Sequence, residues 1–232
     1  MSKKTIMAVG AHIGDAQLTS GMLLAKHAMM GDNIIIVDLT AGERGTPKGM
    51  TPGEFRGQNV EGARQFAESL GGKSVVFDVP DGELYQSKEI ELQLARIMRE
   101  NQVNSVLYHW TNSMHKDHIN ASEITKNAIF FASLPTFPMD DLKPAPISRT
   151  MYAENWEDAS GFEPYCYFDV TEAFPLWESS IKKLWLAEHS NDFKYLRYYT
   201  ALSIMRGAMI KTEHATAFGI DDYAKRVKLE SL

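Results

Sequence analysis

The chain has 232 residues, of which 44% are hydrophobic and 23% charged, and its formal net charge is −6. This length and composition indicate one large globular domain or two small ones and argue against a wholly disordered chain. The acidic balance argues against a nucleic-acid binder, which usually has a basic surface.

The apolar stretch Thr5–Ala11 is short for the core of a secretory leader, and polar residues follow it at once, so we interpret it as a buried strand. No run approaches the roughly 18 apolar residues that a membrane span requires. The one cysteine, Cys166, excludes an internal disulfide, which fits a reducing compartment. We therefore predict a cytoplasmic protein without a membrane span.

Short apolar runs alternate with longer amphipathic segments up to about residue 134. Strands are predicted at 5–11, 33–39, 74–77 and 105–110, and helices at about 16–30, 53–70, 90–101 and 119–133. Continuous apolar strands that alternate with helices are typical of parallel strands joined by right-handed crossovers and covered on both faces. This pattern predicts an α/β fold with a mainly parallel sheet.

The pattern changes after Leu134, where a long irregular connection contains four prolines. Two further strands are predicted at 151–154 and 165–170, and two helices at about 174–188 and 192–209. No linker separates the two parts and no internal repeat occurs. We predict a single domain over residues 1–232, with a core of about 1–134 and a C-terminal extension of about 135–232. Four methionines are expected to fill the core: Met29, Met30, Met205 and Met209.

Polar clusters follow the four predicted parallel strands. They contain His12 and Asp15, then Glu43 and Arg44, then Asp81, and finally His115, Asp117 and His118. Because ligands of open α/β sheets bind beyond the carboxyl ends of the strands, we expect these clusters to meet at one edge.

His12 and Asp15 lie three residues apart at a strand-to-helix turn. A third ligand from His115 or His118 completes two imidazoles and one carboxylate, which is the ligand set of an open catalytic zinc site. The alternative is that Asp15 only caps the following helix and that the histidines make loop hydrogen bonds. The similar cluster in the fourth loop favours the metal site.

Four motifs, in this order, resemble those of the LmbE-like, or PIG-L, deacetylases. They are Ala11-His12-x-x-Asp15, Gly42-Glu43-Arg44-Gly45-Thr46, Pro80-Asp81-Gly82-x-Leu84 and His115-x-Asp117-His118. The resemblance implies a Rossmann-like three-layer sandwich and a zinc-dependent N-acetylglucosaminyl deacetylase, which removes an N-acyl group from an amino-sugar-like small molecule. Relatives are often oligomeric, so a homo-oligomer is expected by resemblance alone.

The resemblance also assigns roles to individual residues. His12, Asp15 and His118 would hold Zn²⁺ or another divalent metal. His115 would stabilise the tetrahedral oxyanion or protonate the leaving amine, and Asp117 would orient a histidine.

Four further residues are candidate substrate contacts: Glu43, Arg44, Arg56 and Asp81. The arginines suit a carboxylate or phosphate and Asp81 suits sugar hydroxyls, although Arg56 equally fits a solvated helix face and Pro-Asp-Gly is an ordinary turn sequence.

The family's first turn usually reads His-Pro-Asp-Asp, and its first aspartate is the general base. Here Ile13 and Gly14 occupy the Pro-Asp positions, and Gln17 stands where many relatives carry glutamate. A positioned base contributes roughly 10²–10⁴-fold to rate. Three explanations stay open: another carboxylate (Glu43, Asp81 or Asp117) is the base, the substrate bond is more reactive, or the protein binds metal or sugar without turnover. A nucleotide-binding protein ranks lower, because the first loop has neither a Gly-x-Gly-x-x-Gly nor a Walker sequence.

Overall fold

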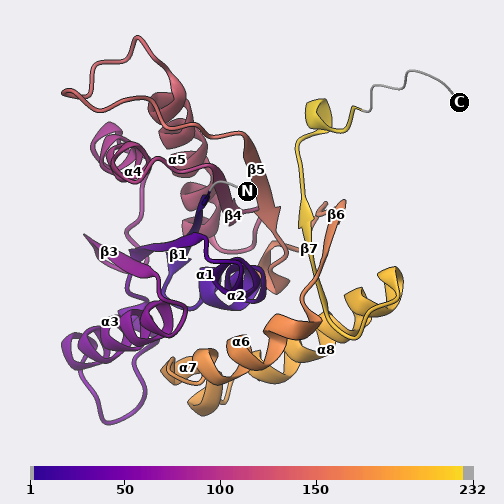
Figure 1. Cartoon of the computed structure of the whole chain (residues 1–232). Coiled ribbons are helices and arrows are strands. Elements are labelled where there is room, and N and C mark those ends of the chain that lie inside the picture. The colour runs from indigo at the N-terminus through magenta and orange to yellow at the C-terminus, as the bar shows by residue number, and fades with distance from the viewer. Residues whose placement is uncertain (1–2, 227–232) are drawn as a thin grey trace, which may run out of the picture.

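A seven-stranded sheet with helices on both faces forms the centre of the molecule (Figure 1). The computed structural model describes residues 3–226. The sheet order is β3-β2-β1-β4-β5-β7-β6. The strands are β1 (Thr5–His12), β2 (Asn33–Thr40), β3 (Lys73–Val79), β4 (Ser105–His109), β5 (Arg149–Ala153), β6 (Cys166–Asp169) and β7 (Ala215–Gly219). The first five are parallel, and β7 runs antiparallel to β5 and β6. The predicted α/β fold with a mainly parallel sheet is confirmed.

Two hydrophobic cores lie on opposite faces of this sheet. Along β1, Ile6 and Ala8 join one core and Met7 and Val9 join the other, as the two-residue period of a strand requires. Because both faces are covered, the parallel strands read as continuous apolar runs. The helices are α1 (Asp15–Thr19), α2 (Gly21–Met29), α3 (Pro52–Ser69), α4 (Lys88–Glu100), α5 (Lys116–Ser133), α6 (Phe174–Ile181), α7 (Trp185–His189) and α8 (Tyr195–Ile210). Helices α4 and α5 cover one face, and α1, α2, α3, α6 and α8 contribute to the core on the other.

Several predicted elements differ in the structure. The first predicted helix is divided at Ser20 into α1 and α2, and the predicted helix at 174–188 is divided into α6 and α7. Strand β7 was not predicted, because its short sequence Ala-Thr-Ala-Phe-Gly has little β-pattern and pairing with β5 and β6 decides its conformation.

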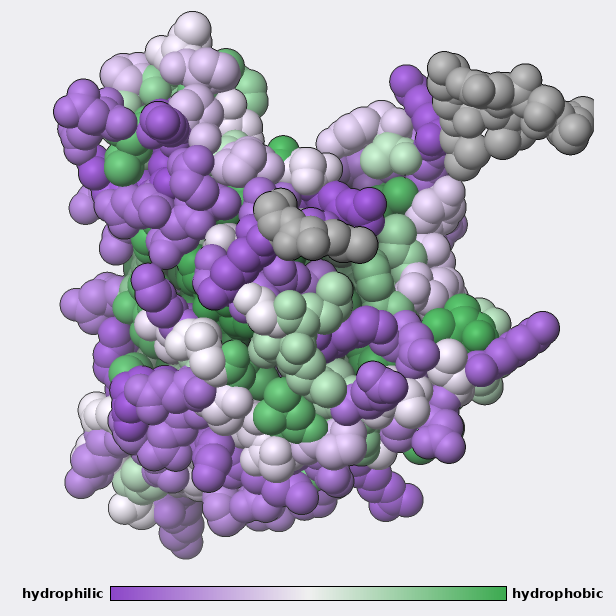
Figure 2. Space-filling view, viewed as in Figure 1, coloured by the Kyte–Doolittle hydropathy of each residue, from purple (hydrophilic) through white to green (hydrophobic). Residues whose placement is uncertain are grey.

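The face shown in Figure 2 is mainly polar, and apolar residues form small patches on it. The prediction that four methionines fill the core was wrong: Met29, Met30, Met205 and Met209 are each at least half exposed. The first two lie at the end of α2 and the others on the outward side of α8. None of the helices within residues 3–226 is both long and apolar enough to cross a membrane.

The long connection after α5 is held by the buried side chain of Arg99. Its guanidinium donates hydrogen bonds to five backbone carbonyls, those of Phe131, Ala132, Leu134, Phe137 and Leu142. A proline-rich segment without regular structure thereby obtains partners for its carbonyl groups.

Strand β1 lies between β2 and β4, so the strand order reverses at this point. A crevice at such a reversal, beyond the carboxyl ends of the strands, is where open α/β sheets bind ligands. His12 is the last residue of β1 and His109 is the last residue of β4. The topology therefore brings these two imidazoles to the position where a ligand is expected.

Candidate metal centre

Three imidazole side chains meet around the carboxylate of Asp15. Asp15 begins α1, and its Oδ2 accepts a hydrogen bond of 2.8 Å from the backbone N–H of His12. The same oxygen lies 3.4 Å from His12 Nδ1, 3.4 Å from His118 Nε2 and 3.2 Å from His109 Nε2. His118 comes from the first turn of α5. Residues that flank two connections, β1–α1 and β4–α5, thus converge on one oxygen atom.

These separations suit a tetrahedral metal ion. Zinc bonds of about 2.0–2.2 Å at tetrahedral angles place neighbouring donor atoms about 3.4 Å apart. Asp15 stands at this distance from both His12 and His118. The three predicted ligands span two overlapping groups of metal-type donors: Asp15 with His109 and His118, and His12 with His115 and His118, each with donor atoms within 4.8 Å of one another. The donor set therefore fits a divalent cation.

Two carboxylates support His12 from its other nitrogen. Nε2 of His12 lies 3.2 Å from Asp81 Oδ1 and 3.4 Å from Asp117 Oδ2. Burial lowers the pKa of His12, but Asp117, Asp15 and Asp81 outweigh it and hold that pKa well above its usual value. Carboxylates placed behind a ligating imidazole orient the ring and raise its basicity.

A third carboxylate, from Asp158, lies behind His109 and His118. It accepts hydrogen bonds from His109 Nδ1 at 2.8 Å and from His118 Nδ1 at 2.9 Å. Burial opposes its ionisation, yet these two bonds lower the pKa of Asp158 to about 2. Sequence reasoning missed Asp158, and it placed His109 in the fourth polar cluster without giving it a role. The signal available was a histidine at the end of a predicted strand, but the Asp158 partner lies beyond β5 and no motif marks it.

His115 borders the same cavity from the N-terminus of α5. Its Nδ1 accepts a hydrogen bond of 3.2 Å from the backbone N–H of Asp117, which leaves Nε2 free to exchange a proton. Burial and the charges of His12 and His118 lower the pKa of His115. Asp117 itself faces His12 and accepts from the Gly82 N–H, rather than contacting the His115 ring with its carboxylate.

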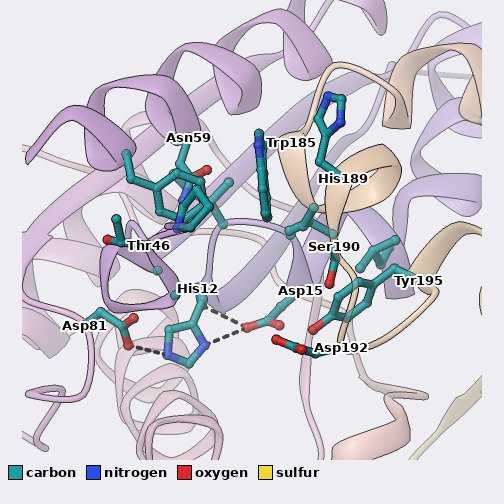
Figure 3. A pocket seen from close by; sticks show the side chains of 18 of the residues that line it. His12, Asp15, Thr46, Asn59, Asp81, Trp185, His189, Ser190, Asp192 and Tyr195 are labelled. Atoms are coloured by element: carbon teal, nitrogen blue, oxygen red, sulfur yellow. Dashed lines mark hydrogen bonds and ion pairs between the residues drawn. The ribbon is translucent and has the colours of Figure 1, made fainter. Parts of the chain in front are cut away.

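The cavity beside these donors has a volume of about 640 Å³ (Figure 3). Four carboxylates line it, those of Asp15, Asp81, Glu157 and Asp192, against one lysine, Lys48. Aromatic side chains form much of the remaining wall: Phe55, Trp156, Trp185, Tyr195 and Tyr199. The cavity is therefore acidic and aromatic.

Two cavity residues from beyond β5 were not expected from the sequence. Figure 3 shows the hydroxyl end of Tyr195 on the Asp15 and Asp192 side of the cavity. Burial and the charges of Glu157, Asp15 and Asp192 raise the pKa of Tyr195 to about 12, so its hydroxyl keeps its proton. Glu157 Oε2 lies 3.6 Å from His118 Nε2, and burial raises the pKa of Glu157.

Three of the predicted substrate contacts have other partners. Glu43 Oε1 accepts from the Asp81 N–H at 2.9 Å, and its Oε2 lies 3.6 Å from Arg56 Nη1. Arg56 also pairs with Asp78 at 2.9 Å, and Arg44 pairs with Glu83 at the surface. Among the described residues that line the cavity, Asp81 is present, whereas Glu43, Arg44 and Arg56 are not. Glu43 and the two arginines shape the loops around the site.

The turn between β1 and α1 contains Ile13 and Gly14, the two positions at which the sequence differs from the His-Pro-Asp-Asp pattern. Gly14 has φ of +119°, and its N–H donates to Gln17 Oε1 at 2.8 Å. The amide of Gln17 in turn donates to Asp38 Oδ2 at 2.9 Å. The turn is therefore held by neutral hydrogen bonds and carries no carboxylate at position 14.

Comparisons with known proteins agree with the motifs. The PIG-L family model, described as GlcNAc-PI de-N-acetylase, matches residues 7–129, just over half of the chain. The chain is 27% identical over 217 residues to 4-oxalmesaconate hydratase of Pseudomonas putida, covering 90% of this chain and 82% of that protein. It is 28% identical over 144 residues to diacetylchitobiose deacetylase of Thermococcus kodakarensis, covering 60% of this chain and 54% of that protein.

Solved structures show the same fold. The structure of 4-carboxy-2-hydroxymuconate hydratase from Pseudomonas putida has a TM-score of 0.84 and 24% identity, with 99% of this chain and 100% of that chain covered. The similar proteins are thus named for two reaction classes, hydration and deacetylation.

Proposed function

The chain belongs to the PIG-L family, and from this premise we propose that it is a metal-dependent hydrolase that removes an N-acyl group, first of all N-acetyl, from a small amino-sugar-like molecule. His12, Asp15 and His118 hold the ion, Zn²⁺ or another divalent metal. The observation that carries the proposal is the distance of 3.4 Å from Asp15 Oδ2 to both His12 Nδ1 and His118 Nε2, at the wall of an acidic cavity.

A divalent metal at these ligands supplies a Lewis acid for the acyl carbonyl and for water. His115 exchanges a proton through Nε2, because its Nδ1 is occupied by the Asp117 N–H. With its lowered pKa, His115 is neutral near neutral pH, so it can receive the proton that the general base takes from the attacking water and pass it to the leaving amine as the C–N bond breaks. The protonated hydroxyl of Tyr195 donates to the developing oxyanion.

Glu157 is the carboxylate that we assign to the role missing at Gly14. It lines the cavity, and its Oε2 lies 3.6 Å from His118 Nε2. The earlier candidates are less suitable: Glu43 is outside the cavity lining, and Asp81 and Asp117 face His12 Nε2. Glu157 is thus free to accept a proton from the attacking water.

The charge of the cavity supports a neutral substrate. The three lining carboxylates that are not assigned as metal ligands, Asp81, Glu157 and Asp192, suit the ammonium group of a deacetylated product better than a polycarboxylate. The aromatic wall residues Phe55 and Trp185, whose ring centroids lie 5.2 Å apart, provide a surface for the apolar face of a sugar ring.

Hydration of a carbon–carbon double bond is the second candidate. It is favoured by the hydratase relative, which matches over most of both chains, and by the absence of the deacetylase aspartate at Gly14. A third outcome is a protein that binds metal or sugar without turnover.

The test compares both reactions with the zinc-loaded protein. N-acetylglucosamine and N,N′-diacetylchitobiose are assayed for free amine and acetate, and 4-carboxy-2-hydroxymuconate for loss of its ultraviolet absorbance. Equimolar amine and acetate support the hydrolase. Loss of absorbance without amine release rejects the hydrolase in favour of the hydratase. Bound metal without either reaction rejects both enzymes in favour of a protein that binds metal or sugar without turnover. His118→Ala is the control for background activity.

A further inference from the structure

Asp158 connects the ends of two strands to α5 through one buried carboxylate. The side chain is fully buried, and each oxygen accepts one imidazole hydrogen bond, from His109 at 2.8 Å and from His118 at 2.9 Å. An ionised carboxylate has no proton to donate. Both imidazoles must therefore carry hydrogen on Nδ1, and either ring could bind a metal only through Nε2.

The two Nε2 atoms have different surroundings, although both lie near Asp15 Oδ2, His109 at 3.2 Å and His118 at 3.4 Å. Nε2 of His109 accepts a hydrogen bond of 3.0 Å from the backbone N–H of Ala11. The pairing between β1 and β4 ends at Ala8 and Leu107, before Ala11. The buried N–H of Ala11 therefore has the His109 imidazole as its acceptor in place of a backbone carbonyl of β4. Ligation of a metal by His109 Nε2 would leave that N–H without its partner, at a cost of roughly 1–3 kcal/mol.

His118 Nε2 has no backbone partner of this kind among the described residues. It lies 3.4 Å from Asp15 Oδ2 and 3.6 Å from Glu157 Oε2, and no hydrogen bond to it is found among residues 3–226. Of the two imidazoles that Asp158 orients, His118 is thus the one whose Nε2 can bind a metal without breaking a hydrogen bond of the described structure.

We propose that His109 and Asp158 are positioning residues: Asp158 sets the tautomer and ring orientation of His118, and His109 locks Asp158 to strand β1 without binding the metal. The site then has three protein ligands and keeps an open position, as catalytic zinc sites do, whereas a fourth ligand from His109 would make a closed, structural site. The inference rests on the proposed function only in requiring that the site binds a divalent metal.

The test measures metal binding and needs no substrate. Zn²⁺ affinity of the metal-free protein is measured by competition with a chromophoric chelator for the wild type, Asp158→Asn, His109→Gln and the double variant. The control is Asp32→Asn, which alters a second histidine–carboxylate pair, His27 Nδ1 to Asp32 Oδ2 at 2.8 Å, remote from the site. The visible spectrum of the Co²⁺-loaded proteins reports the ligand set.

Loss of such a supporting contact typically lowers metal affinity 10–100-fold. We expect this loss for Asp158→Asn and no loss for Asp32→Asn. Since His109 acts through Asp158, the double variant should bind no more than about threefold more weakly than Asp158→Asn alone. The Co²⁺ spectrum of His109→Gln should keep the wild-type shape and intensity.

Wild-type affinity in Asp158→Asn, or an altered Co²⁺ spectrum in His109→Gln, overturns the proposal. If Asp158→Asn does not fold, as judged by circular dichroism, the Co²⁺ spectrum of His109→Gln still decides whether His109 is a ligand. A wild-type protein that binds neither Zn²⁺ nor Co²⁺ overturns the proposed function as well, whereas tight binding unaffected by the variants overturns this inference alone.

Discussion

Leu186 of α7 occupies the space directly over the α-carbon of Gly14. A Cβ atom built on Gly14 would overlap Leu186 Cδ2, and the φ of +119° at Gly14 is a conformation that residues with a Cβ rarely adopt. The position that the resemblance equates with the family's general-base aspartate is therefore covered by an apolar side chain from the C-terminal part. An aspartate at position 14 therefore requires a smaller residue at position 186 as well.

Gly14→Asp alone should destabilise the protein. The unfavourable φ costs about 1–3 kcal/mol, and the overlap with Leu186 adds to it. Urea denaturation of Gly14→Asp, Leu186→Ala and the double variant measures the effect. The double variant should be more stable than the sum of the two single changes predicts, because Leu186→Ala removes the overlap. Additive effects would show that the two residues do not interact.

Asp15→Ala and His118→Ala should each remove bound metal. Each deletes one of two donors that stand 3.4 Å apart. Elemental analysis after zinc loading should find about one ion per chain in the wild type and close to none in the variants. His189→Ala is the matched control, because His189 lines the same cavity but belongs to none of the donor groups found in the described residues. Full zinc content in Asp15→Ala would place the metal elsewhere.

Glu157→Gln should lower kcat by roughly 10²–10⁴-fold on whichever substrate is turned over, the contribution of a positioned base. Zinc content should stay at the wild-type level, since Glu157 is assigned to proton transfer and not to ligation. Glu43→Gln changes a carboxylate outside the cavity lining and serves as the comparison. A Glu157→Gln enzyme with wild-type kcat would leave the base unassigned.

Zinc affinity should rise with pH, and the rise should continue above the usual histidine pKa of 6.5. A proton on His12 competes with the metal, and Asp117, Asp15 and Asp81 outweigh burial to hold the pKa of His12 well above 6.5. For the metal-free protein the sign is opposite: the stability from protonated His12 is fully present below pH 6.5 and is lost as pH rises through the raised pKa. Chelator competition and urea denaturation between pH 5.5 and about 9 measure the two trends. Asp81→Asn should move the rise in zinc affinity and the loss of metal-free stability to lower pH. If neither pH dependence moves, Asp81 does not raise the pKa of His12.

Arg99→Leu should destabilise the fold by about 3 kcal/mol, because five backbone carbonyls lose their donor, two in the last turn of α5 and three in the connection after it. Arg96→Ala is the control on the same helix. Arg96 is exposed and pairs with Asp140 at the surface, so its loss should cost less than about 1 kcal/mol. Equal urea midpoints for the two variants would contradict the role of Arg99.

The sequence by itself determined the sheet and the edge where the site lies. Apolar runs of strand length can be buried only between two layers of helices, and parallel strands bring their carboxyl ends together, so His12, Asp15 and His118 were predicted as neighbours. Their role as metal ligands stays a prediction, as do the substrate and the oligomeric state.

Tertiary structure decided which side chains complete the site. Asp158, Glu157, Tyr195 and Leu186 come from segments after β5, and no local pattern marks them, because their partners are more than 30 residues away in the chain. Arg56 was predicted to contact a substrate because of its charge, but in the folded chain it pairs with Asp78 and Glu43 instead. Periodicity reports what a segment buries, whereas the partner of a polar group depends on distances that only the folded chain defines.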